Sequence, residues 1–538
     1  MPRPTSIQHL PTEVLDIIIS LLEGRVGLYA VVCRRWQKVV ERYSFKSISI
    51  RSIHLEELRA IFGRNPHHLH RRASLKHISL EVILPTYSAR ACAKFERPED
   101  MMANNSVFTE AIHTFFGILH DWEVHGLQNG GGGYTLCNIG FSLSISSPMD
   151  DGCNRTDISL HKGKIPRQPP TSRDCGDTRF AHSYIQLIGL KERPLPILSC
   201  IYFFRAQFFR RQLAGASAAA LACALPKLED LELSLSDHEW MFPLTRQKNR
   251  YDFGQALHTL CLNNTALQSF SLSYVMEEPT DHGFCIPNAL PDNSPDTDTL
   301  SQALHALSQS STLTYVYLDD IVVSEELFWP KNIPSTSGRP FWPALKEFAV
   351  YANPTTPTGQ WYFERNIHYP PTTSDGQDDF PITPSFFPDE HADQEDEWLS
   401  TDSEPDPLDE YRNLRLCGQA RINKFRRRLS PELFNPLVFA FARAVQRMPK
   451  LNLFNFSMNS GGSPVFQAEW VRDGIVSSQW DGYEGEEEEQ EIGKQRWTFI
   501  IIEETEWEVP GGLMAILNDT LGERGLFRFR TVDRDVIQ

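Results

Sequence analysis

A short apolar pattern recurs along most of this chain and constrains its fold more than any other feature. A leucine, or once a phenylalanine, is followed by apolar residues three and five positions later, with polar residues between them. The pattern begins at seven positions: Phe45, Leu75, Leu228, Leu267, Leu313, Leu345 and Leu451. Apolar residues at alternate positions predict a half-buried β-strand with one face turned to the core. We therefore expect seven similar strands distributed through the chain.

Helical patterns precede several of these expected strands. Three segments place apolar residues three or four positions apart on one helix face: Phe253, Leu257 and Leu260; Leu300, Leu304 and Leu307; Leu437, Phe441 and Val445. Asn435 and Pro436 are expected to cap and open the third helix. A repeated helix, turn and strand form the unit of a stacked α/β solenoid, in which each unit buries its apolar side against its neighbours.

The repeated unit resembles an irregular leucine-rich repeat. The regular family ends its strand pattern with an asparagine that satisfies backbone groups of the turn, and Asn353 and Asn459 match that position. The units from Leu228, Leu267 and Leu313 are 39, 46 and 32 residues long, whereas regular repeats have about 20–29. The resemblance therefore implies a curved solenoid with insertions. An unrelated α/β domain with several alternating strands remains the alternative.

Residues 10–45 predict two short amphipathic helices. Pro11 fits a first helical position and Glu13 a first turn, so the first helix should begin at about Thr12. Its apolar face consists of Val14, Leu15, Ile18, Ile19 and Leu22. The second helix should bury Leu28, Val31, Val32, Trp36 and Val39 and expose Arg34, Arg35, Lys38 and Arg42. Helices this short need a packing partner to be stable in water.

The residue types in this stretch carry a further resemblance. They are Leu10, Pro11, Glu13, Val14 and Leu15, then Val32, Cys33, Arg34, Trp36 and Gln37, and finally Glu41 and Phe45. The combination resembles an F-box, in the form common among filamentous fungal proteins. That family uses a small three-helix bundle to dock on a Skp-type adaptor within SCF ubiquitin ligases. The resemblance implies an adaptor-binding face of Leu10, Pro11, Val14, Leu15, Ile18, Val32, Cys33 and Trp36. The link at residues 23–27 is shorter than the family's usual leucine-containing link.

The negative charge of the chain is concentrated in one segment. Residues 369–411 contain 14 acidic residues, seven prolines and no lysine or arginine, and without this segment the net charge falls from −17 to −3. Such a composition predicts a disordered acidic insertion. The remaining chain has no broad basic field, so we do not expect a nucleic-acid partner.

The expected domain organisation follows from these patterns. We predict an α/β protein with a small N-terminal helical F-box bundle and first strand at residues 1–52, followed by an irregular leucine-rich-repeat-like α/β solenoid at residues 53–368. The acidic insertion at residues 369–411 then separates the solenoid from a last repeat and C-terminal α+β cap at residues 412–538.

Cysteine usage and hydropathy bear on the compartment. The ten cysteines are scattered without a Cys-x-x-Cys pair, which favours a reducing compartment. The longest apolar run, residues 213–225, is too short to span a bilayer, and no basic and then apolar leader opens the chain. We expect a soluble protein in the cytoplasm, the nucleus or both, with no membrane partner.

The sequence carries no recognisable enzyme motif. The chain lacks HExxH, the Gly-x-Ser-x-Gly elbow, the Walker loop and the dinucleotide fingerprint. The glycine run at residues 130–133 is followed by Tyr134 and Thr135, which indicates a surface loop rather than a phosphate loop. The clustered His67, His68 and His70 lie beside Arg64, Arg71 and Arg72, which favours a solvated basic loop over a zinc site.

The sequence therefore predicts a non-enzymatic protein without a cofactor or metal. Asp319 and Asp320 follow a predicted strand, where catalytic carboxylates often lie, but carboxylates are also ordinary at strand ends. The resemblance implies a substrate-recognition subunit that joins a Skp-type adaptor and cullin complex to an unknown protein target. The alternatives are a scaffold acting outside ubiquitin ligation and an enzyme with an unrecognised site in residues 97–200.

Overall fold

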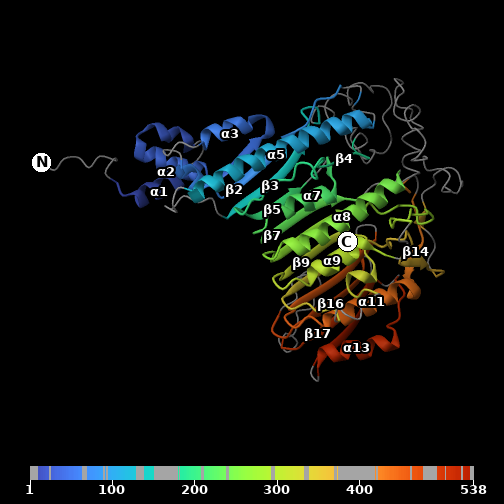
Figure 1. The fold of residues 1–538 in the computed structure, drawn as a ribbon. Coiled ribbons are helices and arrows are strands. Elements are labelled where there is room, and N and C mark those ends of the chain that lie inside the picture. The colour runs from blue at the N-terminus through green and yellow to red at the C-terminus, as the bar shows by residue number, and fades with distance from the viewer. Residues whose placement is uncertain are drawn as a thin grey trace, which may run out of the picture.

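One large, mostly parallel sheet organises the chain, as the computed structural model in Figure 1 shows. The structure describes residues 10–22, 26–63, 69–88, 91, 95–128, 138–150, 180, 182–207, 211–237, 242–292, 297–331, 339–368, 372–373, 418–419, 422–460, 463–475, 493–502, 505–522 and 525–532. In this part of the chain the fold is mixed α/β, and the large sheet does not close into a barrel.

The large sheet contains twelve strands that lie in chain order. They are β1 (Ser47–Arg51), β2 (His77–Ile83), β3 (Ile139–Ser146), β5 (Ile201–Gln207), β7 (Asp230–Ser236), β8 (Ser269–Val275), β9 (Tyr315–Ile321), β10 (Glu347–Ala352), β15 (Leu453–Ser460), β16 (Ser463–Val471), β17 (Arg496–Ile502) and β18 (Leu526–Val532). Neighbouring strands are parallel except that β16 runs antiparallel to both β15 and β17. All seven strands expected from the repeated pattern are present in this sheet.

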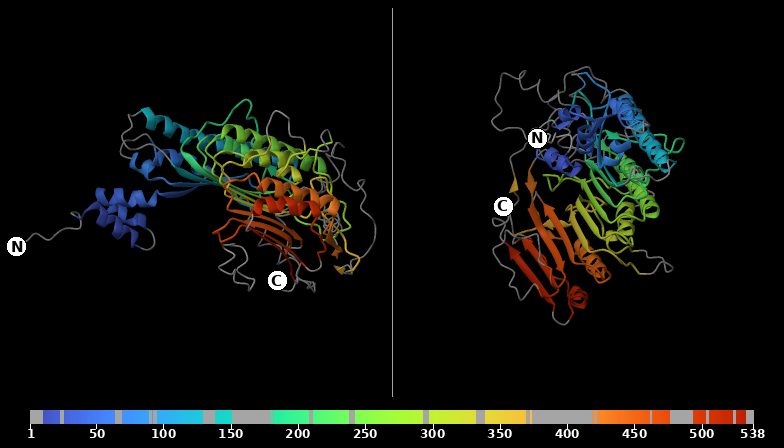
Figure 2. Two further views of the ribbon diagram at one scale, coloured as in Figure 1. Left: turned by 90° about the horizontal axis from the view of Figure 1, so that it is seen from below. Right: turned by 90° about the vertical axis from the view of Figure 1, so that its left-hand side faces the viewer.

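Helices cover one face of this sheet (Figure 2, left). They include α3 (Leu55–Ile61), α4 (Leu69–Ser74), α5 (Pro98–Gln128), α7 (Gly215–Cys223), α8 (Pro243–Asn263), α9 (Thr299–Ser308), α11 (Pro431–Val445) and α13 (Gly511–Leu521). The alternation of the strands explains this layering. In β7, β8 and β9 the apolar positions are buried and the intervening polar positions are half-buried. Only one face of these strands can therefore bury against helices.

Within the described ranges, three pairs of short strands lie outside the large sheet. β4 (Tyr184–Ile185) pairs with β6 (Gln212–Leu213), β11 (Phe363–Arg365) with β14 (Arg426–Leu429), and β12 (Thr372–Thr373) with β13 (Asn423–Lys424). Two single 3-10 turns, η3 (Ser52–His54) and η7 (Glu325–Leu327), follow β1 and β9. None of the described helices is both long enough and apolar enough to cross a membrane.

Small side chains allow the helices to approach one another closely. The alanine-rich run at residues 213–225 forms the buried helix α7, which packs against α8. A Cβ atom at Gly215 would lie 2.4 Å from the Phe253 ring, and one at Gly254 would lie 2.9 Å from backbone atoms of Thr299 and Leu300. The start of α9 thus rests directly on the backbone of α8.

The substitution Gly254→Ala is expected to lower stability by about 1–3 kcal/mol, because the added methyl group meets backbone atoms that cannot rotate away. Gly117→Ala in α5 is the matched control, since a Cβ there has no neighbour within 4 Å. Alanine should stabilise that helix by about 0.4–1 kcal/mol. Chemical denaturation measures both. Equal midpoints for the two variants would contradict the close contact between α8 and α9.

One helix start differs from the sequence expectation and another agrees with it. The third helix begins one turn earlier than Asn435, at Pro431 after Ser430, so Pro436 lies inside α11. Ser430 and Pro431 offer the same sequence of cap and first residue, and the Asn435 side chain instead accepts a hydrogen bond from the Trp507 indole at 3.0 Å. At the N-terminus α1 begins at Thr12 as expected, and Pro11 is the residue before the helix rather than its first residue.

Several expectations fall on residues that the structure does not describe. The acidic insertion at residues 369–411 lies outside the described residues apart from Thr372 and Thr373, and the glycine run at residues 130–133 lies outside them entirely. β10 and β15 flank the acidic segment in sequence and are neighbours in the sheet. The strands before and after the acidic segment therefore belong to the same sheet.

Candidate functional site

The N-terminal helices form a small core of their own. α1 (Thr12–Ser20), the 3-10 helix η2 (Val26–Val31) and α2 (Arg34–Ser44) contribute to it. The buried residues are Leu15, Ile19, Trp36, Val39 and Val40, and Leu10, Ile18, Leu22, Ala30 and Cys33 pack partly buried against them. This cluster is separate from the main core under the sheet. In Figure 1 the helices lie at one end of the molecule, beside the first strands.

The expected second helix from Leu28 to Val39 is wrong. The chain forms η2, breaks at Val32 and Cys33, and only then begins α2. Leu28 is 71% exposed and Val31 is 88% exposed, whereas Trp36 and Val39 are buried. The helical spacing predicted the buried residues correctly only within α2. The preceding 3-10 turn is wound more tightly than an α-helix, so it rotates Leu28 and Val31 away from the core.

The eight residues implied as an adaptor-binding face divide into three groups. Leu15 and Trp36 are buried in the small core. Leu10, Ile18 and Cys33 are partly buried at its margin. Pro11, Val14 and Val32 are exposed. The first group can hold the helices together, and only the last two groups present atoms to a partner.

A second apolar stripe runs along α1 and onto Leu21, the residue after the helix, and only its member Val14 was expected in a binding face. Val14 is 37% exposed, Ile17 59% and Leu21 75%, and their spacing places them on one side of the helix. The core-facing side of the same helix holds Leu15 and Ile19. The number of apolar residues in α1 could have indicated this stripe, because the helix has more of them than one packed face can cover. Exposed apolar surface of this kind marks interaction sites.

A shallow, open depression of about 430 Å³ adjoins this stripe. Its lining comes from α1, α2 and the segment just after α2: Asp16, Ile17, Ile19, Ser20, Arg42, Tyr43 and Lys46. Arg42 Nη2 lies 3.1 Å from Asp16 Oδ1, so an ion pair joins the two helices beside Ile17. The depression is open to solvent and offers a place for an apolar side chain of a partner beside a charged rim.

Glu41 fastens α2 to α4. Its carboxylate accepts hydrogen bonds from Arg71 Nη2 at 2.6 Å and Gln37 Nε2 at 2.9 Å, and lies 2.6 Å from His70 Nε2. Burial by itself would raise the pKa of Glu41, but the hydrogen bonds from Arg71, Gln37 and His70 outweigh it and lower the pKa to about 2. The small helical unit is thereby held beside the first helices of the sheet region.

The expected solvated basic loop around His70 is therefore wrong in its described part. His70, Arg71 and Arg72 belong to α4, and Arg72 is buried with its guanidinium 5.2 Å from the Trp122 ring centroid. The buried carboxylate of Glu41 draws His70 and Arg71 inward. His67 and His68 lie outside the described residues. No group of His, Cys, Asp or Glu side chains in the described ranges could hold a metal ion.

Comparison with known proteins does not extend this description. No protein-family model and no curated protein matches the sequence.

Residues 97–200, where an unrecognised enzyme site was an alternative, border a buried charged cluster. Arg211 lies 2.5 Å from Glu96 Oε1 and 3.2 Å from Asp150 Oδ1, and its guanidinium is 3.5 Å from the Phe180 ring centroid. Tyr87 donates a hydrogen bond to Asp150 at 2.9 Å. All three charged side chains are nearly inaccessible to solvent. These charged side chains pair with one another and so hold together segments that are far apart in the chain.

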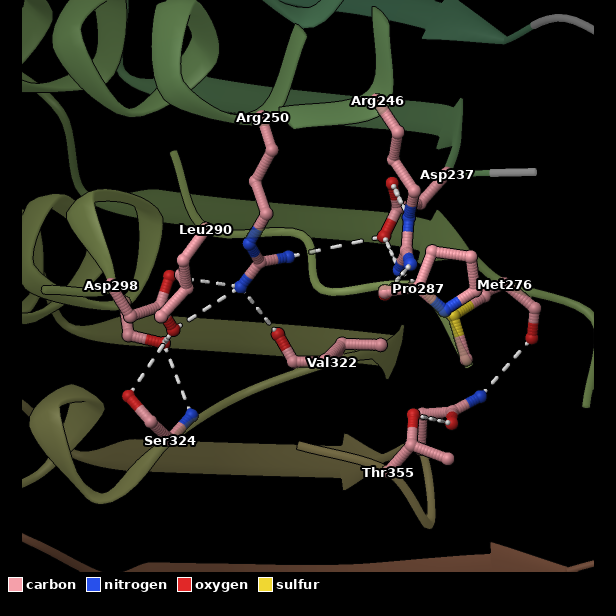
Figure 3. A network of polar contacts seen from close by, with 12 residues as sticks. Asp237, Arg246, Arg250, Met276, Pro287, Leu290, Asp298, Val322, Ser324 and Thr355 are labelled. Carbon is pink, nitrogen blue, oxygen red and sulfur yellow. Dashed lines mark hydrogen bonds and ion pairs between the residues drawn. The ribbon is translucent and has the colours of Figure 1, made fainter. Parts of the chain in front are cut away.

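A second buried network lies just past the ends of β7, β8 and β9 (Figure 3). Arg246 of α8 makes a two-pronged contact with Asp237, with Nε–Oδ1 at 3.0 Å and Nη2–Oδ2 at 2.7 Å. Arg250 donates to Asp298 Oδ1 at 3.0 Å and to the Val322 carbonyl at 2.9 Å. Sequence periodicity gave no sign of it, because two arginines on a helix usually face solvent.

Asn353 follows β10 and bonds to backbone of a neighbouring turn. Its Nδ2 donates to the Met276 carbonyl at 3.1 Å, which satisfies backbone of the turn that follows β8. Asn459 instead lies within β15, where its Oδ1 accepts a hydrogen bond from Ser457. Asp237 is the first residue after β7, as Asn353 is after β10, and it pairs with Arg246.

Asp319 and Asp320 lie within β9 rather than after it. Asp320 has a φ of 49°, and the pairing of β9 with β10 is irregular beside it. Burial, followed by the neighbouring charges of Asp319 and Glu278, raises the pKa of Asp320 to about 6, although a hydrogen bond to Asn353 opposes the change. A raised pKa means that the folded state gains stability from this group at low pH and loses it as pH rises through about 6.

Asp320→Asn is therefore expected to stabilise the protein at pH 7, with the advantage shrinking towards pH 4. Asparagine accepts the left-handed backbone conformation, so the exchange mainly removes the charge. The full pKa change would correspond to about 3 kcal/mol, and solvent screening of this partly exposed carboxyl reduces the expectation to about 1–2 kcal/mol. Thermal unfolding at both pH values is the measurement. A stability difference between the variant and the wild type that is the same at both pH values would contradict the raised pKa of Asp320.

Proposed function

We propose that this chain is the substrate-recognition subunit of an SCF-type E3 ubiquitin ligase. In this proposal the N-terminal helices are an F-box that binds a Skp-type adaptor, and the adaptor connects the chain to a cullin. The residue pattern that resembles the fungal F-box supports the assignment. The second support is physical: α1 carries apolar residues on two sides, and only one side is covered within the described chain.

The observation that carries the proposal is the exposed stripe of Val14, Ile17 and Leu21. These side chains expose apolar area on a helix whose other side already packs on Trp36 and Val39. A partner that covers the stripe would gain about 25 cal/mol for each Å² of apolar surface removed from water. Pro11 and Val32 would extend the contact, while Leu15 and Trp36 would keep the helices in shape.

We propose that the remaining chain is an irregular leucine-rich-repeat-like α/β solenoid. The in-order arrangement of parallel strands supports this proposal, because each unit then contacts mainly its sequence neighbours. The pairing of α7 with α8 and of α8 with α9 follows the same order on the helical side. Such an array would present its uncovered strand face to a protein target. Catalysis would belong to partner enzymes, and this chain would supply proximity between the target and the ubiquitin donor.

Recovery of the adaptor and a cullin together with the purified full chain tests the proposal. Both proteins should co-purify in comparable amounts. Recovery of the adaptor without a cullin would instead favour the scaffold that acts outside ubiquitin ligation. Recovery of neither would remove the F-box assignment.

A further inference from the structure

The face of the sheet opposite the helices carries aligned rows of side chains in strands β7 to β10. Hydrogen-bonded register places Asp230, Ser269, Tyr315 and Glu347 in one row. The next row holds Glu232, Ser271, Tyr317 and Ala349. We call the set of Asp230, Glu232, Ser269, Ser271, Tyr315, Tyr317, Asp319, Glu347 and Tyr351 the β7–β10 face. No helix of the described chain covers it, and its side chains are half-buried or exposed.

The β7–β10 face is strongly acidic. It holds four carboxylates, whereas Arg205 of β5 is the one lysine or arginine within strands β5, β7, β8, β9 and β10. Arg205 is already paired with Glu232. Asp230 also lies within the field of Arg205, which leaves one cation for four carboxylates on these strands. Negative potential therefore accumulates over the centre of the face.

Local titration behaviour agrees with this charge distribution. Burial, then the charge of Glu347 and the nearby Tyr351, Asp230 and Glu232, raises the pKa of Tyr315. Burial and the charge of Glu232 raise the pKa of Asp230, although Ser269 and Arg205 oppose the change. Asp230 Oδ1 is inaccessible to solvent and has no hydrogen-bond partner in the described chain. A cation beside Asp230 would offset the burial and the charge repulsion that disfavour its ionised form.

Aromatic rings stand among the carboxylates. The Tyr317 and Tyr351 ring centroids are 5.5 Å apart with their planes tilted by 47°. The serine side chains of β8 lie between the carboxylates of β7 on one side and the tyrosine rings of β9 and β10 on the other. The small serines therefore form a strip between larger side chains. Tyrosine rings attract lysine and arginine through their negative faces, and serine supplies adaptable hydrogen bonds.

We propose that the β7–β10 face binds a basic segment of the target protein, with lysine or arginine side chains placed over Tyr315 and Tyr317 between the carboxylates of β7 and Glu347. The inference rests on the proposed function, since it names the class of target. Nucleic acids, anionic membranes and the chain's own acidic residues 369–411 carry the same sign of charge as the face and are repelled by it.

The strand spacing sets the spacing of the basic residues. Three inter-strand steps of about 4.8 Å separate β7 from β10, which is about 14 Å. An extended chain covers this distance in about four residues. Two arginines four positions apart in an extended segment can therefore reach Asp230 and Glu347 together.

Binding of labelled 12-residue Gly/Ser peptides to the full chain, measured by fluorescence anisotropy, tests the proposal. A peptide with two arginines four positions apart should bind at least about tenfold more tightly than one with two glutamates, and 0.5 M salt should weaken it about tenfold. Asp230→Asn combined with Glu347→Gln should weaken arginine-peptide binding about tenfold or more, and Tyr317→Leu about threefold. Glu81→Gln on the same face in β2, where Arg51 lies 3.1 Å away, is the matched control and should change binding less than twofold.

Three results would overturn the inference: equal binding of the two peptides, unchanged binding by the Asp230 and Glu347 double variant, or a dimer of the wild-type chain in sedimentation that this variant dissolves. The last result would make a second copy the occupant. Adaptor capture, measured on the same samples, separates the two proposals. Retained capture with no peptide selectivity removes the basic target alone, and lost capture with selective peptide binding removes the F-box function alone.

Discussion

The double substitution Val14→Glu and Ile17→Glu is expected to weaken binding of a Skp-type adaptor about 100-fold or more. Both side chains are exposed, at 37% and 59%, so the small core of Leu15 and Trp36 is left intact. Apolar anchors at the centre of an interface contribute about 1.4 kcal/mol or more each, and 1.4 kcal/mol corresponds to a factor of ten. Two buried carboxylates would add the cost of desolvation. Titration calorimetry with the purified adaptor and full chain measures the change.

Lys38→Glu is the matched control for this experiment. It introduces the same side chain at an exposed position of α2, on the side opposite the small core, and should change affinity less than threefold. Leu15→Ala provides the contrasting case, because it removes a fully buried residue from a core of five and should cost about 2–5 kcal/mol. That variant would lose binding through unfolding, which protease sensitivity near residue 45 would detect. Full binding by the Val14 and Ile17 double variant would remove the F-box assignment.

Asp298→Ala is expected to lower stability by about 3–5 kcal/mol. Arg250 is 1% exposed, and Asp298 is its carboxylate partner at 3.0 Å, while Asp237 lies 3.9 Å away. Removing one member of a buried ion pair leaves the other charge uncompensated. Asp298 also accepts hydrogen bonds from Ser301 and Ser324, which would lose their acceptor. Figure 3 shows Ser324 beside Asp298. The denaturant midpoint of the full chain measures the loss.

The same helix supplies the matched control for the buried pair. Asp252 of α8 pairs with Lys248 at 2.9 Å, but both side chains are largely exposed. Asp252→Ala should therefore change stability by less than about 0.5 kcal/mol. Replacing both buried partners, with Arg250→Met and Asp298→Leu, should recover most of the loss, since paired apolar side chains can substitute for a buried ion pair. An Asp298→Ala variant as stable as Asp252→Ala would contradict a structural role for the network.

The sequence located the strands well because alternation is a local property. Each repeated pattern became a strand, and the helices preceding β8 and β9 appeared where their apolar spacing indicated. It did not reveal β5, whose aromatic residues hide the alternation, nor the earlier start of α11 at Pro431. In both places the local sequence is compatible with more than one structure, and packing against other elements selects one of them.

The sequence by itself determined where the seven patterned strands and most of the expected helices form, and which segment concentrates the charge of the chain. Only the tertiary structure decided what those elements expose. The turn at η2 directs Leu28 and Val31 to solvent, Glu41 draws His70 and Arg71 inward, and strand register aligns Asp230 with Tyr315 and Glu347. These outcomes depend on contacts between residues far apart in the chain. Local periodicity contains no information about such contacts, because register and burial are set only when the elements pack together.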